Sequence, residues 1–213
     1  AIGHGAGSSV TTGVRNLLVG GLAGDAITSG DNNIAIGYAA MTANTLADRN
    51  VAIGNEALEA FNITSSTDSY NIAVGFQAGH VMTTGVNNTL IGGLAGDALT
   101  DADFNVAVGT SALSADTLGS RSTAIGRNAL ANQNFTSATD SHNTAVGFNA
   151  GLSVTTGTQN TLLGDSTGDA ITTGQNNTLV GRNVDCASDA ANAIGLGHSL
   201  SLIHISEPTR QKP

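Results

Sequence analysis

The stretch NTAVGFNAGLSVTTGTQ, residues 143–159, contains the unit from which the chain is built. Its first five residues follow the pattern Asn, small or β-branched, Ala or Leu, aliphatic, Gly, and this pentapeptide recurs at short, nearly constant intervals. A repeat this short predicts the stacked coils of a solenoid, not a globular domain with one core. The copies begin at Asn16, Asn33, Asn50, Asn71, Asn88, Asn105, Ser122, Asn143, Asn160 and Asn177.

The intervals themselves form a longer period. Most copies follow the previous one after a short step, as from Asn16 to Asn33, but the steps from Asn50 to Asn71 and from Ser122 to Asn143 are longer. Because one step in four is long, residues 71–99 return in similar form as residues 143–171, and we call this shift the long period. The unit that was duplicated is therefore a block of four coils.

Partial copies of the pentapeptide lie near both ends of the chain. Ile2 and Gly3 precede the first full copy, and Ile194 and Gly195 follow the last one in a shortened unit. We therefore expect a single repeat domain over residues 1–198, cut from a longer array at both ends.

The pentapeptide is predicted to be a short β-strand, because its central residues favour strands and are bounded by Asn and Gly. A second short strand is expected near VMTTG (81–85), SVTTG (153–157) and AITTG (170–174). Two strands per coil predict an all-β fold, a parallel β-roll or β-solenoid of about eleven coils, on the order of 50 Å long. Aligned Asn side chains are expected to hydrogen-bond the backbone of neighbouring coils.

The third and fourth positions of the pentapeptide face opposite sides, because side chains alternate across a strand. The fourth is Val, Ile or Leu in every copy, and the third is Ala or Leu. Two apolar faces predict that the fourth position lies inside the coil and that the third position packs on something else, most simply on copies of the same chain. The alternative is that two sheets of one chain enclose both layers. The predicted contacts between copies are Leu18, Ala35, Ala52, Ala73, Leu90, Ala107, Ala124, Ala145, Leu162 and Leu179.

Composition limits the possible partners. Aromatic residues make up 3% of the chain, there is no Trp, and Gly numbers 28, so thin layers of aliphatic side chains must form the core. The formal net charge of −9 argues against binding to nucleic acid or to an anionic membrane. No stretch approaches the roughly 18 apolar residues of a membrane span. The single cysteine, Cys186, is expected to be a buried filler and not a reactive thiol.

The end of the chain does not follow the repeat. Both prolines and the only lysine, Lys212, lie in the last residues, and the LSLIHISEPTR portion (200–210) reads like a translated sequencing adapter. Residues 199–213 are therefore predicted to be a non-native, disordered tail.

Several copies resemble a known family. NNIAIGYAA (32–40), RNVAIGNEAL (49–58), STAIGRNAL (122–130) and NTAVGFNAG (143–151) resemble the head repeats of YadA-like trimeric autotransporter adhesins, and similar strings occur in bacteriophage tail-fibre shafts. The resemblance implies a left-handed β-roll that trimerises side by side, with small residues toward the three-fold contact. It also implies an extracellular location, on a bacterial surface through a missing C-terminal anchor or in a virion tail fibre.

The sequence offers no enzyme-like constellation. The histidines occupy different repeat positions and are expected to be solvated turn residues, and no catalytic, cofactor or metal site is predicted. Asp25, Asp97 and Asp169 recur at the long period, about 19 Å apart by strand spacing, and are expected to cap their own turns. A carbohydrate-active β-helix enzyme would need clustered acids. An ice-binding solenoid would need an unbroken threonine ladder.

The coils with a long step contain the candidate binding loops. Each adds a Ser-, Thr- and Asp-rich loop with an aromatic residue at its base, and both loops are expected to project from one edge. The alternative is a tolerated insertion packed by its Phe. The candidate residues are Phe61, Asn62, Thr64, Asp68, Tyr70, Phe135, Thr136, Asp140 and His142.

These patterns predict a non-enzymatic structural and adhesive rod, the head or shaft of a trimeric surface adhesin or phage fibre. Its partners would be two further copies and a host-surface or matrix receptor, bound by multivalent display. A passive spacer that holds a distal domain is the alternative.

Overall fold

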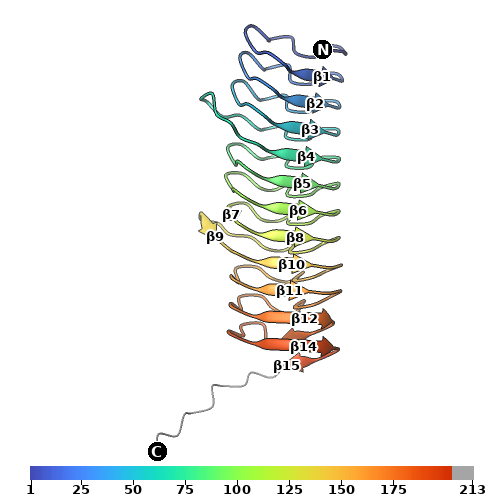
Figure 1. Cartoon of the computed structure of the whole chain (residues 1–213), viewed down its shortest axis with the longest axis vertical. Helices are drawn as coiled ribbons and strands as arrows, with labels where there is room; N and C mark the ends of the chain where they lie inside the picture. The colour runs from blue at the N-terminus through green and yellow to red at the C-terminus, as the bar shows by residue number, and fades with distance from the viewer. Residues whose placement is uncertain (203–213) are drawn as a thin grey trace, which may run out of the picture.

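The computed structural model describes residues 1–202, and this part of the chain is an all-β solenoid without a helix. Eleven short strands stack in one parallel sheet along the length of a straight rod (Figure 1). The strands of this sheet are β1 Leu17–Val19, β2 Ile34–Ile36, β3 Val51–Ile53, β4 Ile72–Val74, β5 Thr89–Ile91, β6 Val106–Val108, β8 Thr123–Ile125, β10 Thr144–Val146, β11 Thr161–Leu163, β12 Thr178–Arg182 and β14 Ile194–His198.

Each strand pairs with the same pentapeptide positions in the next coil. In β4 and β5, for example, Ala73 faces Leu90 and Val74 faces Ile91. The register is the same for short and long steps, since Ala52 faces Ala73 across the first long step. The long coils therefore absorb their extra residues outside the sheet.

The long period is visible in the structure as two equivalent stretches of the rod. We call residues 50–121 the first block and residues 122–193 the second block; each begins with one long coil. The strands β3 to β6 belong to the first block, and β8 to β12 belong to the second.

The side chains at the third position form the inner face of the sheet. All ten lie inside the single chain with at most 2% of their surface exposed, so the prediction that they contact other copies was wrong. They pack against residues from the turns on the other side of the same coils, including the column Ala23, Ala40 and Ala57. The corrected residues are Leu18, Ala35, Ala52, Ala73, Leu90, Ala107, Ala124, Ala145, Leu162 and Leu179.

The inner position is Leu in some coils and Ala in others because the core is thin. Leu90 is flanked by Gly79 and Gly96, where an added Cβ would lie 2.8 and 2.9 Å from its methyl carbons. The turn position held by Gly79 and Gly96 is Leu113 in the coil of β6, and there the inner strand residue is Ala107. A large inner strand residue thus lies beside small turn residues, and a small one lies beside a large turn residue, as close packing requires.

A column of buried asparagines joins the coils at the start of each strand. The backbone N–H of Asn88 donates to Oδ1 of Asn71 at 3.0 Å, and that of Asn105 donates to Oδ1 of Asn88 at 2.9 Å. In most copies Nδ2 donates across the coil, as from Asn88 to the carbonyl of Ala102 at 2.7 Å, whereas Nδ2 of Asn50 donates to Ser69 Oγ at 3.0 Å. The predicted bonding between Asn side chains and neighbouring backbone is confirmed.

Ser122 is the one member of the column without a carboxamide, and a neighbour supplies it. Gln133 donates from Nε2 to Ser122 Oγ at 3.0 Å and to Asp116 Oδ2 at 2.6 Å. Its Oε1 accepts from Nδ2 of Asn143 at 2.8 Å. The side chains of Ser122, Asp116 and Gln133 are fully buried, so this network replaces the missing asparagine within the interior.

The side of the coil opposite the strands is less regular than predicted. The second strands expected at residues 81–85, 153–157 and 170–174 are absent from these segments of residues 1–202. There, three successive N–H groups, of Thr83, Thr84 and Gly85, converge on the carbonyl of Thr100, which is not a strand ladder. Within the same described range, the small sheets outside the main one are β7 Gly119–Ser120 with β9 Thr139–Asp140, and β13 Asp185–Cys186 with β15 Ser201–Leu202.

The second of these small sheets corrects the predicted tail. Ser201 and Leu202 pair with Asp185 and Cys186, and the N–H of Asp185 donates to the carbonyl of Leu200 at 2.7 Å. Residues 199–202 therefore continue the last coil, contrary to the disordered tail expected from residue 199. Residues 203–213, the rest of that tail, lie outside the described residues.

A glycine after each strand turns the chain sharply. Gly92, after β5, has φ of +137°, and an added Cβ would lie 2.5 Å from the carbonyl oxygen of Gly109 in the next coil. Neither the dihedral nor the contact admits a side chain, because L-residues avoid this region and the neighbour is backbone.

We expect Gly92→Ala to destabilise the fold by at least about 2 kcal/mol, because it adds backbone strain to a clash. The adjacent Gly93→Ala is the matched control, since nothing lies within 4 Å of its added Cβ. Chemical denaturation followed by circular dichroism measures both. Equal stability of the two variants would contradict this reading of the turn.

Candidate functional site: the outer face of the sheet and its edges

The outward face of the sheet is apolar along its whole length. The fourth pentapeptide position, which the sequence placed inside the coil, points outward, and the second position shares this face. Ile91 and Ile125 are 39% and 38% exposed, and Leu163 is 46% exposed. Every fourth-position residue is aliphatic: Val19, Ile36, Ile53, Val74, Ile91, Val108, Ile125, Val146, Leu163, Val180 and Leu196.

The second position completes this surface, which we call the outer strip. It is formed by the side chains of the second and fourth positions of the eleven strands of the main sheet. The second position is Val, Ile, Leu or Thr throughout: Leu17, Ile34, Val51, Ile72, Thr89, Val106, Thr123, Thr144, Thr161, Thr178 and Ile194. None of the residues that form the outer strip is charged.

Aromatic residues extend the outer strip at its borders. Phe76 and Phe148 follow the glycines at the strand ends and are about half exposed, and Tyr70 and Phe104 lie at the strand starts with similar exposure. The Arg121 guanidinium lies 4.8 Å from the ring centre of Phe104, in the geometry of a cation–π contact. The strip is therefore apolar at its centre and mixed at its edges, the usual anatomy of a protein interface.

The two candidate loops leave the rod on the same side, as predicted, near β4 and at β9 (Figure 1). Phe61 and Phe135 are buried at the base of their loops, which agrees with the packed-insertion reading. They are not equivalent, because the long period aligns Phe61 with Gln133. The exposed members of the predicted set are Thr64, Asp68, Tyr70, Thr136, Asp140 and His142.

Ion pairs and backbone bonds hold the loops against the preceding coil. Asp68 pairs with Arg49, and Asp140 pairs with Arg121 at 3.0 Å; the two ion pairs are related by the long period. Asn62 is half-buried, and its Oδ1 accepts from the Thr45 hydroxyl at 2.8 Å, so its role is to anchor the loop. The structure does not bring the two loops together into one site, because a whole block separates them.

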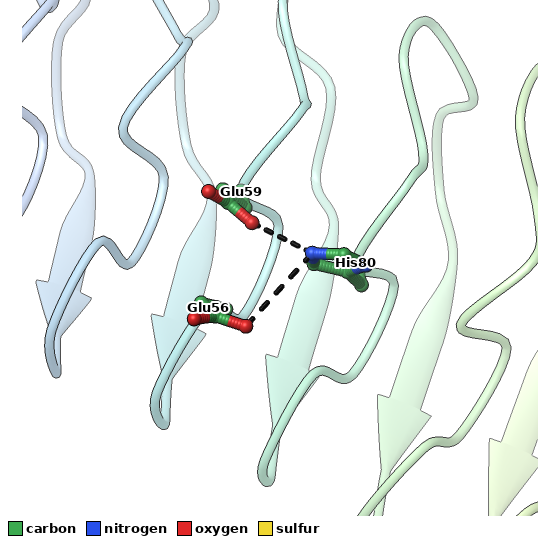
Figure 2. A group of neighbouring side chains, drawn as sticks. All are labelled: Glu56, Glu59 and His80. Carbon is green, nitrogen blue, oxygen red and sulfur yellow. Dashed lines mark hydrogen bonds and ion pairs between the residues drawn. The ribbon is translucent and has the colours of Figure 1, made fainter.

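A cluster that the sequence analysis missed lies beside the first loop. Glu56 and Glu59 follow β3, and His80 lies in the next coil with its Nε2 directed at both carboxylates (Figure 2). Nε2 lies 2.6 Å from Oε2 of Glu59 and 3.9 Å from Oε2 of Glu56. His80 is a turn residue, as predicted, but only about one-third of its side chain is exposed and its imidazole contacts two carboxylates, so it is less solvated than expected.

The signal for this cluster was present in the spacing. His80 follows Glu59 by the same interval that separates Asn71 from Asn50, so the two occupy the same turn position in adjacent coils. Asp97 follows His80 by a short step and occupies that position one coil further. Glu59 and His80 occupy this turn position in coils between Asp25 and Asp97, so the recurrence of aspartate at the long period does not reveal them.

Among residues 1–202, three carboxyl groups have raised pKa values, and in each case burial is the main cause. Burial raises the pKa of Asp97, against smaller opposing effects of a backbone hydrogen bond and the charge of His80. Burial also raises the pKa of Asp116, although Gln133 and three backbone groups bond to it. The pKa of Asp185 is raised to about 6 by burial and by the neighbouring Asp169.

Cys186 is buried, as expected of a filler. Burial and then the charge of Asp185 raise the pKa of its thiol to about 11. Because the thiolate is the reactive form, this environment disfavours reaction at neutral pH.

Comparison with known proteins identifies no relative: no family model, no curated protein and no solved structure matches the chain. Among residues 1–202 there is also no helix that is long and apolar enough to cross a membrane.

We expect the protein to unfold at higher temperature at pH 4.5 than at pH 7.5. The folded Asp185, with its pKa of about 6, holds a proton that the unfolded group, at 3.8, has released. The stabilisation of the fold by protonation of Asp185 is therefore complete below about pH 3.8 and is lost as the pH rises through about 6. Each 1 kcal/mol corresponds to about 2–4 °C in Tm for a chain of this size.

Asp185→Asn should reduce the difference in Tm between the two pH values, because the variant has no proton to lose at that position. Asp189→Asn, at an exposed residue of the same coil, is the matched control. A difference that stays unchanged in Asp185→Asn would contradict the assignment.

Proposed function

We propose that the protein is a structural rod that associates side by side with two further copies of itself, and that the resulting fibre serves in attachment at an extracellular surface. The observation that supports this most strongly is the outer strip. An unbroken column of outward aliphatic side chains, one from each strand of the main sheet, faces solvent in the single chain.

The size of the outer strip favours a protein partner. Eleven strands at about 4.8 Å spacing, each about 10 Å wide, give a flat area on the order of 500 Å². That is at the upper end of the largest apolar patches of monomeric proteins. The accessible area is larger than this flat projection because side chains protrude, and a stable interface buries roughly 800 Å² per partner.

Copies of the same chain are the simplest occupants. The outer strip is straight and repeats at the spacing of the coils, so another copy offers a matching surface along the entire rod. In a closed ring of three copies, every outer strip packs against a neighbouring copy. The resemblance of the repeats to trimeric adhesin heads and tail-fibre shafts agrees with this arrangement.

Attachment would come from the loop tips in this proposal. Residues 64–66 and 136–138 are exposed and rich in hydroxyl groups, and a trimer would display six such tips. Weak contacts repeated in this way gain strength through effective concentration. The receptor would be a host surface or matrix component.

Charge on the outer strip should separate the copies. We expect the chain to sediment at three times its monomer mass, and the double variant Ile91→Lys with Ile125→Lys to sediment as a folded monomer, because buried lysines at the interface would lack partners. The control is Val10→Lys with Val81→Lys. These residues have nearly the same exposure, 37% and 38%, but lie off the sheet. A wild-type monomer, or equal masses for both variants, would refute the proposed assembly.

The loop tips can be tested separately from the assembly. We expect beads coated with the protein to adhere to a panel of cells and matrix surfaces, and to lose adhesion when residues 64–66 and 136–138 are all replaced by Gly. The exposed tips should change without loss of the fold, which circular dichroism checks. Adhesion that persists in this variant would favour the passive-spacer alternative for the loops.

A further inference from the structure

We propose that Glu56, Glu59 and His80 form a binding site for a zinc-class divalent cation that joins two consecutive coils. The proposal is independent of the assembly and of the loop tips. It rests on the geometry of the three side chains, on their place in the repeat and on two polar neighbours.

The three ligand atoms converge on one point between two coils. One atom from each residue lies within 4.8 Å of the others, and all three side chains are about one-third exposed or less (Figure 2). Ligands held about 2.1 Å from a tetrahedral ion lie about 3.4 Å apart. The measured separations of 2.6 and 3.9 Å from His80 Nε2 bracket this value, so small side-chain rotations admit the ion.

The repeat itself indicates that the fold does not require these residues. In the second block the same positions are Asn128, Ala131 and Leu152, and the coils stack in the same register. Two carboxylates on one turn, such as those of Glu56 and Glu59, repel each other, and partial burial increases this repulsion. A bound cation would offset this repulsion. Cation binding therefore accounts for the presence of the cluster, whereas coil stacking does not require it.

Two further residues are placed to support the ligands. Gln77 Nε2 donates to Oε2 of Glu56 at 2.7 Å and orients that carboxylate from the next coil. Asp97, one coil beyond His80, has a buried Oδ1 that is the one such side-chain atom in residues 1–202 without a hydrogen-bond partner. A histidine that ligates a metal usually donates its other ring N–H to a carboxylate, and Asp97 lies in the coil on the far side of His80 from Glu59.

The ligand set selects the class of ion. An imidazole nitrogen with two carboxylate oxygens suits zinc and similar first-row divalent ions, with water completing the shell. Mg²⁺ and Ca²⁺ prefer oxygen ligands alone. The ion would take the place of the hydrogen bond between His80 Nε2 and Glu59 Oε2, and any proton on Nε2 would leave to solvent when the ion binds.

The ion would link the first long coil of the rod to the coil that follows it. Glu59 and His80 lie on either side of the expanded segment, residues 60–79, that contains the first loop. A cation held by both closes this segment at its base. Because it binds the folded chain alone, its effect on thermal stability should grow with its concentration.

The test is calorimetric titration of the whole, metal-stripped and tag-free protein with ZnCl₂. We expect one ion per chain, and binding at least about tenfold weaker in Glu56→Gln, Glu59→Gln and His80→Ala. Circular dichroism of each variant should be unchanged, because the second block folds without these residues. Zn²⁺ should raise the Tm of the wild-type protein and leave that of His80→Ala unchanged, while MgCl₂ and CaCl₂ should not displace it.

His4→Ala is the matched control, since His4 is exposed and lies in the first coil away from the carboxylates. It should bind Zn²⁺ as the wild type does. Equal binding in His80→Ala and His4→Ala would mean adventitious surface binding only and would overturn the proposal, as would displacement of Zn²⁺ by equimolar Mg²⁺ or Ca²⁺.

The duplicated block allows a gain-of-function test. The combined variant Asn128→Glu, Ala131→Glu and Leu152→His reproduces the cluster in the second block, where Asp169 already occupies the place of Asp97. We expect it to bind two ions per chain. A folded variant that still binds one would contradict the claim that these positions build the site.

Discussion

The buried asparagine column is the constraint on which the other features depend. Each carboxamide accepts the backbone N–H at the equivalent position of the next coil, and most also donate to a carbonyl on the opposite side of their own coil. Both bonds lie in an apolar interior, where losing either is costly. The column fixes where each strand begins. Because strands then start at the same level in every coil, the strand residues face one another in register, and extra residues can enter only on the opposite side.

A second consequence is the thinness of the core. A strand as short as β5 presents a single inner side chain, which must fill the space left by the turn opposite. Leu90 fits between Gly79 and Gly96, whereas Ala107 faces the larger Leu113. Only one residue per strand can be buried in this way, so the aliphatic residues on either side of it are directed outward. The apolar outer strip thus follows from the short strand as well as from the sequence.

The pentapeptide predicted the strands, their spacing and the single parallel sheet. It could do so because it combines strand-forming residues with a Gly at the place of a sharp turn. Which face is inner was not predictable from composition, since Ala35 and Ile36 are both apolar and the size of the opposing turn residue decides the matter. The second strand was predicted from threonine-rich segments such as residues 81–85, but converging backbone bonds replace a ladder there. The Glu56, Glu59 and His80 cluster becomes visible only when residues are compared across the long step.

The substitution at Ser122 has a consequence for how such a chain can change. The first block uses Asn50 with Phe61, and the second uses Ser122 with Gln133, at positions related by the long period. In the second block Gln133 supplies the carboxamide that Ser122 lacks, through bonds to Ser122 and Asn143. Recombination between the duplicated segments can place its crossover between these two positions. One product would then have Ser at the first position and Phe at the second, which would leave buried polar groups without partners. The repeats are therefore exchangeable as whole coils but not at every boundary, and their history of duplication is restricted by pairs of residues that must be inherited together.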